Sequence, residues 1–160
     1  MPEPAQVPPA SPEAGAQPGV FIEPYRAYNF KLVVQGVTEG HFTECSGLAI
    51  KVQAIKYREG GARQVVHRIP GPVEYADVSL RYGLTTSSEL FDWFMTAVNG
   101  KVERKNVSIL MLDSDGATEM MRWDLFNAWP SEWRGAFLDA MNREIAIETL
   151  TLVFETLQRA

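Results

Sequence analysis

Alternating apolar and polar residues dominate the chain from Tyr28 onward. Phe30, Leu32 and Val34 alternate with residues 31, 33 and 35, the spacing that places successive side chains on opposite faces of a strand. Similar patterns predict further strands at 41–44, 49–57, 63–69, 77–84, 106–112, 119–128 and 144–157. Asp113-Ser114-Asp115-Gly116 separates two of these strands and predicts a hairpin turn. The chain is therefore predicted to be mainly β.

Only one segment shows clear helical periodicity. Thr86-Ser87-Ser88-Glu89 fits a capping box, and Gly100 fits a left-handed helix end. An apolar stripe at helical spacing lies between them: Leu90, Phe91, Trp93, Phe94, Ala97 and Val98. We expect one helix, at about 86–99, packed over the strands. This composition predicts an antiparallel β-sandwich or a partly closed barrel.

Two segments depart from a simple sheet. The segment 56–72 contains Gly60, Gly61, Pro70 and Gly71, which predict a long loop or an excursion from the sheet. The last strand is apolar on both faces, with Ile145, Ile147 and Val153 on one face and Ala146, Leu150, Leu152 and Phe154 on the other. Such a strand is either central between two layers or buried by another subunit. With one helix available as cover, the pattern favours assembly.

The N-terminal segment has a different composition. Seven of the ten prolines fall within 1–24, together with alanine, glutamine and glutamate, so this segment cannot supply a packed core. We predict a flexible arm at 1–24, either dispensable or ordered against a neighbouring subunit, followed by a single domain at 25–160. No basic residue precedes Arg26 and no apolar run precedes Val20, as a secretory signal would require.

Charge and composition exclude several classes of function. The formal net charge of −5 argues against a surface that coats nucleic acid. No stretch approaches the roughly 20 apolar residues of a membrane span, so we expect no direct membrane insertion. The single cysteine, Cys45, cannot form an internal disulfide, which fits a protein made in a reducing compartment.

Candidate reactive groups are few. His41 and Cys45 are four residues apart in a predicted strand, too far apart to act together unless the chain bends. The acidic turn at 113–116 lacks the glycine position and the third acidic ligand of a calcium loop. No phosphate-binding, nucleophile-elbow or zinc-binding motif occurs. We therefore expect no enzyme activity, and no catalytic, cofactor or metal site.

Several phrases, in order, carry a resemblance to a known family. They are Phe42-Thr43-Glu44-Cys45-Ser46-Gly47-Leu48, Tyr57-Arg58-Glu59-Gly60, Pro70-Gly71, Glu89-Leu90-Phe91-Asp92-Trp93, Asn127-Ala128-Trp129-Pro130 and Ile145-Ala146-Ile147-Glu148-Thr149-Leu150. From Tyr28 to Leu157 the chain resembles the tube proteins of contractile phage tails and of extracellular contractile injection systems. The long proline-rich arm departs from the family pattern.

The resemblance implies a structural function. Six subunits would form a ring by joining strands into one β-barrel, and rings would stack into a hollow tube that delivers cargo. The implied partners are further copies of the chain, a sheath protein, baseplate or spike proteins, and protein or DNA cargo in the lumen. Assembly would be cytoplasmic, within a tail-like particle that can be released from the cell.

The resemblance also assigns two surfaces. The ring-stacking loop would contain Lys56, Tyr57, Arg58, Glu59, Arg63, His67 and Arg68. The inter-subunit strand would contain Ile145, Ile147, Leu150, Leu152 and Phe154. An alternative is a tube-initiating ring that links the tube to the baseplate or spike. A remote alternative is a small cysteine-dependent hydrolase that uses Cys45.

Overall fold

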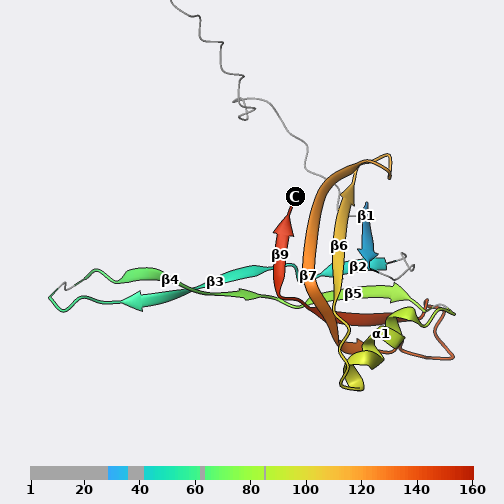
Figure 1. Cartoon of the computed structure of the whole chain (residues 1–160). Coiled ribbons are helices and arrows are strands. Elements are labelled where there is room, and N and C mark those ends of the chain that lie inside the picture. The colour runs from blue at the N-terminus through green and yellow to red at the C-terminus, as the bar shows by residue number, and fades with distance from the viewer. Residues whose placement is uncertain (1–28, 36–41, 62–63, 85) are drawn as a thin grey trace, which may run out of the picture.

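The computed structural model describes residues 29–35, 42–61, 64–84 and 86–160, so the predicted arm at 1–24 lies outside the described residues. The described elements follow the chain in this order: β1 Phe30–Val34, β2 Phe42–Ser46, β3 Ile50–Tyr57, β4 His67–Tyr75, β5 Val78–Gly83, α1 Glu89–Val98, β6 Lys105–Leu112, β7 Glu119–Arg134, β8 Ile147–Val153 and β9 Thr156–Arg159. Figure 1 shows one body of strands and a long β3–β4 hairpin that extends from it.

The body consists of two antiparallel half-sheets that share β7. One half-sheet has the order β1-β6-β7-β9, and the other continues through β7-β8-β5-β2. The first part of β7 pairs with β6 up to Ala128, and the rest pairs with β8 from Trp129 onward. Just before this change of partner, Asn127 adopts a left-handed φ of 53°, and its side chain donates a hydrogen bond to Glu155 Oε2 at 2.9 Å. This irregularity lets β7 turn from one half-sheet into the other, so that the two sets of strands cross (Figure 1).

The hydrophobic core lies between the half-sheets. Leu32, Val34 and Leu125 of the first half-sheet and Leu80 and Leu150 of the second are almost completely buried. Helix α1 covers one side of this core and contributes Leu90 and Trp93. The Trp93 indole Nε1 donates to the Glu103 carbonyl oxygen at 2.7 Å, so its polar atom is satisfied in a mostly apolar site.

The predicted fold class is confirmed. The chain is mainly β and antiparallel, with α1 as the helix of the described residues, and its strands do not close into a barrel within one chain. No helix in this part of the chain is long and apolar enough to cross a membrane.

The predicted ends of the helix had different outcomes. Helix α1 begins at Glu89 after the N-cap residue Ser88, whose hydroxyl donates to the Asp92 carboxylate at 2.8 Å instead of capping the backbone. The capping box at 86–89 is therefore wrong. The C-terminal end is confirmed: Gly100 has a φ of 77° and its N–H donates to the Ala97 carbonyl, while the Lys101 N–H donates to that of Thr96.

Three predicted strand boundaries need correction. Strand β4 continues through Pro70 and Pro72, where a loop was expected, because both prolines lie in an exposed two-stranded ribbon. Strand β7 extends six residues past the predicted end at 128, to Arg134. The predicted strand at 144–157 is two strands, because the chain leaves β8 after Val153 and β9 pairs with the other half-sheet.

Candidate functional site

The β3–β4 hairpin is an exposed ribbon that extends from the body of the fold (Figure 1). It forms its own two-stranded sheet, and every residue of β3 is exposed to solvent. The hairpin is joined to the body at its base, where the Tyr75 and Phe154 rings lie 5.5 Å apart and the Ala76 N–H donates to the Ala49 carbonyl at 3.0 Å. An isolated two-stranded ribbon is only marginally stable in water. This hairpin is therefore expected to need a partner along its length.

The apolar side of the hairpin changes halfway along it. Near the base, Val52 pairs with Val73 and Ile50 with Tyr75, all on one face. Nearer the tip, Ile55 pairs with Ile69 on the opposite face. The change coincides with a bulge in β4, where two residues lie opposite Gln53. Each half of the hairpin thus presents an apolar surface in a different direction.

A glycine permits the close approach of the two strands at this bulge. A Cβ atom on Gly71 would lie 2.8 Å from the Gln53 carbonyl oxygen, which is closer than real contacts allow. A larger residue at position 71 would therefore push the two strands apart at the bulge. The side-chain amide of Gln53 donates a hydrogen bond to the Glu74 carboxylate across the two strands.

The predicted ring-stacking residues gather in the distal half of this hairpin. Lys56 and Tyr57 end β3, Arg58 and Glu59 follow it, and His67 and Arg68 begin β4. Arg63 lies outside the described residues. Among the residues that the structure describes, no ion pair joins Lys56, Arg58 or Arg68 to an acidic group. Their charges therefore remain available for a contact outside the chain.

The predicted inter-subunit strand lies mostly inside the chain. Strand β8 is central, between β7 and β5, and Leu150, Leu152 and Phe154 are buried in the core. These three side chains are already covered by the chain's own core, and the assignment of this strand to a contact between subunits stays a prediction. Ile147 is half-buried and Ile145 is 80% exposed, which leaves only these two for contact with another copy.

The half-sheet β1-β6-β7-β9 has an apolar face and a polar face. Its apolar face supplies Leu32, Val107 and Leu125 to the core. Alternation places these residues on the other face, which is polar at its centre and has three apolar members: Lys31, Val33, Ser108, Leu110, Arg122, Asp124, Phe126, Thr156 and Gln158. Strands β1 and β9 are its two edges, and within the described residues each pairs on one side only.

A compact network occupies the centre of that polar face. The Ser108 hydroxyl donates to Asp124 Oδ1 at 2.6 Å, and Arg122 Nε donates to the same oxygen at 2.8 Å. Arg122 Nη2 also donates to the Ser108 hydroxyl oxygen at 3.1 Å. The hydrogen bond from Ser108, with that from Arg122, lowers the pKa of Asp124, and the contact raises the pKa of Arg122. The network keeps this face charged and ordered at neutral pH.

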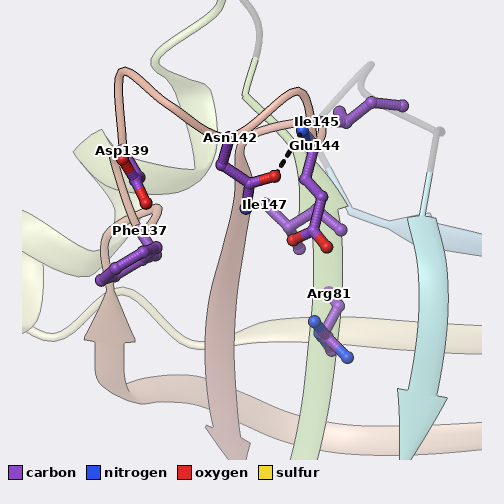
Figure 2. Close-up of a pocket in the computed structure, with 7 residues that line it drawn as sticks. All are labelled: Arg81, Phe137, Asp139, Asn142, Glu144, Ile145 and Ile147. Atoms are coloured by element: carbon purple, nitrogen blue, oxygen red, sulfur yellow. Dashed lines mark hydrogen bonds between the residues drawn. The ribbon is translucent and has the colours of Figure 1, made fainter.

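The loop between β7 and β8 forms a surface of which only Ile145 was predicted to be a contact. Residues 135–146 carry four large apolar side chains that are at least 78% exposed: Phe137, Leu138, Met141 and Ile145. Phe137 and Ile145 line a pocket of about 150 Å³. Figure 2 shows its lining residues, which are Arg81, Phe137, Asp139, Asn142, Glu144, Ile145 and Ile147. The sequence does contain a signal for the rest of this surface, because Phe137, Leu138 and Met141 are large apolar residues outside any predicted strand or helix.

The remaining candidate groups are Cys45, His41 and the acidic turn at 113–116. Burial raises the pKa of the Cys45 thiol to about 11, so it is protonated at neutral pH, and His41 lies outside the described residues. In the turn at 113–116, Asp115 accepts hydrogen bonds from Thr118 and Ala117, and these bonds, led by the Thr118 hydroxyl, lower its pKa to about 2. Across the described part of the chain, no three acidic, histidine or cysteine side chains are placed to hold a metal ion.

Comparison with known proteins agrees with this architecture. The family described as T4-like virus tail tube protein gp19 matches residues 26–158. A chain in the sheath-tube complex of an extracellular contractile injection system, PVC, in its extended state is 29% identical, with a TM-score of 0.76, covering 86% of this chain and 91% of that chain. No curated protein sequence matches the chain.

Two further solved structures extend the comparison. A chain in the tube-terminating cap of the anti-feeding prophage is 25% identical, with a TM-score of 0.75, covering 88% of this chain and 93% of that chain. Hcp1 from Flavobacterium johnsoniae is 17% identical, with a TM-score of 0.52, covering 81% of this chain and 93% of that chain, and it shows a likeness of fold alone.

Proposed function

This chain belongs to the family of T4-like virus tail tube proteins, and on that premise we propose that six copies close into a ring and that such rings stack into a hollow tube. The chain is a structural tail tube protein and not an enzyme, because the family and the PVC chain that resembles it are structural tube proteins. What it contributes is a set of surfaces that join one copy to the next.

The observation that carries the ring proposal is the four-stranded half-sheet with two free edges, β1 and β9. A free edge presents unpaired backbone N–H and C=O groups, which promote uncontrolled association unless they are paired or covered. In a ring, β1 of one copy pairs with β9 of the next, and closure removes every edge. A barrel shared by all copies then replaces the barrel that one chain does not close.

The two faces of this half-sheet support an orientation within the ring. The apolar face is already covered by the chain's own core, so the face with Lys31, Ser108, Arg122 and Asp124 turns toward the channel. A channel wall of hydrogen-bonded, charged side chains stays hydrated and offers little apolar surface to which cargo could adhere. Protein cargo fits such a wall, and DNA is the alternative cargo.

The β3–β4 hairpin supports the stacking part of the proposal. Its distal half carries the proposed ring-stacking residues, and its exposed apolar residues need cover. Its basal apolar face, with Ile50, Val52 and Val73, points in another direction and is left for the neighbour within the ring. Charged side chains at a repeated contact set register, and each weak contact is multiplied around the ring.

The outer surface of such a tube would contact a sheath, and its ends would contact a baseplate or a cap. The PVC comparison supports a sheath partner, because that structure is a sheath-tube complex. A tube-initiating ring is the second candidate for the same fold. The 29% identity to a chain of a sheath-tube complex favours the tube itself. Assembly in the cytoplasm before release is consistent with the free thiol of Cys45.

Electron microscopy of the purified chain in negative stain tests the proposal. Rings should appear in the images, together with longer stacks at high concentration. By light scattering, a ring of six 17.9 kDa chains should have a mass of about 107 kDa. Long tubes identify the main tube subunit, whereas capped single rings identify a tube initiator. Light scattering that detects only monomers over a wide concentration range would refute the ring.

A further inference from the structure

Two exposed apolar surfaces of this chain lie at opposite ends of the molecule. In Figure 1, the β3–β4 hairpin extends far to the left, and the loop that joins β7 to β8 lies at the right, beyond α1. The distal hairpin exposes about half of each of Ile55, Tyr57 and Ile69, and the loop exposes Phe137 and Ile145 still more. Because they are far apart, one chain cannot cover its own hairpin with its own loop.

The β7–β8 loop combines apolar residues with negative charge. Asp139 and Glu144 line its pocket beside Phe137 and Ile145 (Figure 2). Arg81 also lines the pocket, but its guanidinium forms an ion pair with Glu44 at 3.0 Å. In the described structure, the Glu144 carboxylate makes no ion pair. The pocket is therefore a net acidic site with an apolar rim.

The hairpin has the opposite charge. Residues 50–75 contain five basic residues, namely Lys51, Lys56, Arg58, Arg63 and Arg68, against two acidic ones, Glu59 and Glu74. The hairpin segment thus carries a formal charge of +3, and the rest of the chain carries −8, because the total is −5. Such a distribution favours contact between the hairpin of one copy and the body of another.

We propose that the distal half of the hairpin docks on the β7–β8 loop of a second copy of this chain. Ile55, Tyr57 and Ile69 cover the exposed apolar side chains of the loop. Lys56 and Arg68 lie opposite each other on the other face of the hairpin, so their charges attract Asp139 and Glu144 over a longer range. The contact joins two different surfaces, so it propagates head to tail from copy to copy. The inference rests on the proposed function, since it names the surface that receives the stacking hairpin.

A charge swap tests the electrostatic part of this contact. Arg68→Glu and Glu144→Arg should each raise the protein concentration needed for tube formation by up to about tenfold, because each reverses one of the two attracting charges. Combining the two should restore tube formation. Glu119→Arg, which makes the same change of charge away from the pocket, serves as the matched control and should form tubes normally. Normal tubes from both single variants, or no restoration by the double variant, would overturn the inference.

Cross-linking tests the pairing directly. In a chain with Cys45→Ala, the substitutions Tyr57→Cys and Ile145→Cys place one thiol on each surface. A short bismaleimide reagent should then produce a ladder of covalent dimers, trimers and longer chains on a denaturing gel. Each single-cysteine variant should give no ladder, and a mixture of the two should stop at dimers. Tubes that form normally without a ladder would refute this docking while leaving the tube function intact, whereas absence of tubes from the unmodified chain would refute the tube function itself.

Discussion

Tyr75, at the base of the protruding hairpin, packs against Phe154 of the core with ring centroids 5.5 Å apart. This contact couples an exposed ribbon to the interior of the domain. Phe154 is 6% exposed, whereas Tyr57 near the other end of the hairpin is 52% exposed. We therefore expect Phe154 to act in folding and Tyr57 to act in assembly.

Truncation of Phe154 and of Tyr57, in separate variants, should separate folding from assembly. Phe154→Ala should lower the free energy of unfolding by about 3–5 kcal/mol, because it removes a buried ring and leaves a cavity. Tyr57→Ala should change it by less than about 0.5 kcal/mol, because the side chain is exposed. Urea denaturation of the unassembled protein measures both. Equal losses of stability would show that the hairpin is part of the folded core.

Charge reversal at the start of the hairpin turn should impair stacking. Arg58→Glu and Glu59→Lys, made separately, should leave single rings intact while fewer rings join into tubes, because charges at a repeated contact set its register. Counting free rings and tubes by electron microscopy measures the effect. If both variants form tubes of normal length, this segment is a solvated turn and takes no part in stacking.

The polar face of the β1-β6-β7-β9 half-sheet should make stability depend on pH. Hydrogen bonds from Ser108 and Arg122 lower the pKa of Asp124, so its carboxylate stabilises the fold fully above the unfolded pKa of about 3.9. Asp124→Asn should cost about 1 kcal/mol at neutral pH. That difference from the wild type should shrink as the pH falls below about 4, because the unfolded carboxylate takes up its proton there while the folded one is still ionised. A difference that stays constant well below the unfolded pKa would contradict this origin.

Cys45 should be slow to react with thiol reagents in the folded protein. Burial raises the pKa of its thiol to about 11, so little thiolate is present at pH 8. Iodoacetamide labelling, followed by mass spectrometry, should be slow in buffer and fast in denaturant. Fast labelling of the folded chain would instead indicate an activated thiol and would revive the hydrolase alternative.

Removal of the proline-rich arm should leave the domain stable. A chain that lacks residues 1–20 should keep the melting temperature of the full chain within a few degrees, because the segment has no apolar periodicity with which to join the core. Thermal unfolding monitored by circular dichroism measures this. A large fall in melting temperature would show that the arm packs on the domain.

Local patterns in the sequence are enough to predict most of the strands and the C-terminal end of the helix. Leu32 and Val34 alternate with exposed residues because one face of β1 rests on the core, and alternation records that burial directly. Gly100 marks the end of α1 because a left-handed φ favours a residue without a side chain. The capping box failed because Ser88, two residues beyond Thr86, occupies the N-cap.

Only the tertiary structure decides which apolar residues are covered. Ile55 and Leu150 are equivalent in their local patterns, yet Ile55 lies on an exposed ribbon and Leu150 in the core. Likewise, the segment 144–157 has one continuous pattern but splits between two half-sheets, because pairing with β7 is a contact between residues distant in sequence. The spacing of apolar residues shows that one face of a strand avoids water. Which element buries that face is decided by the packing of the whole chain, because the elements in contact are distant in sequence.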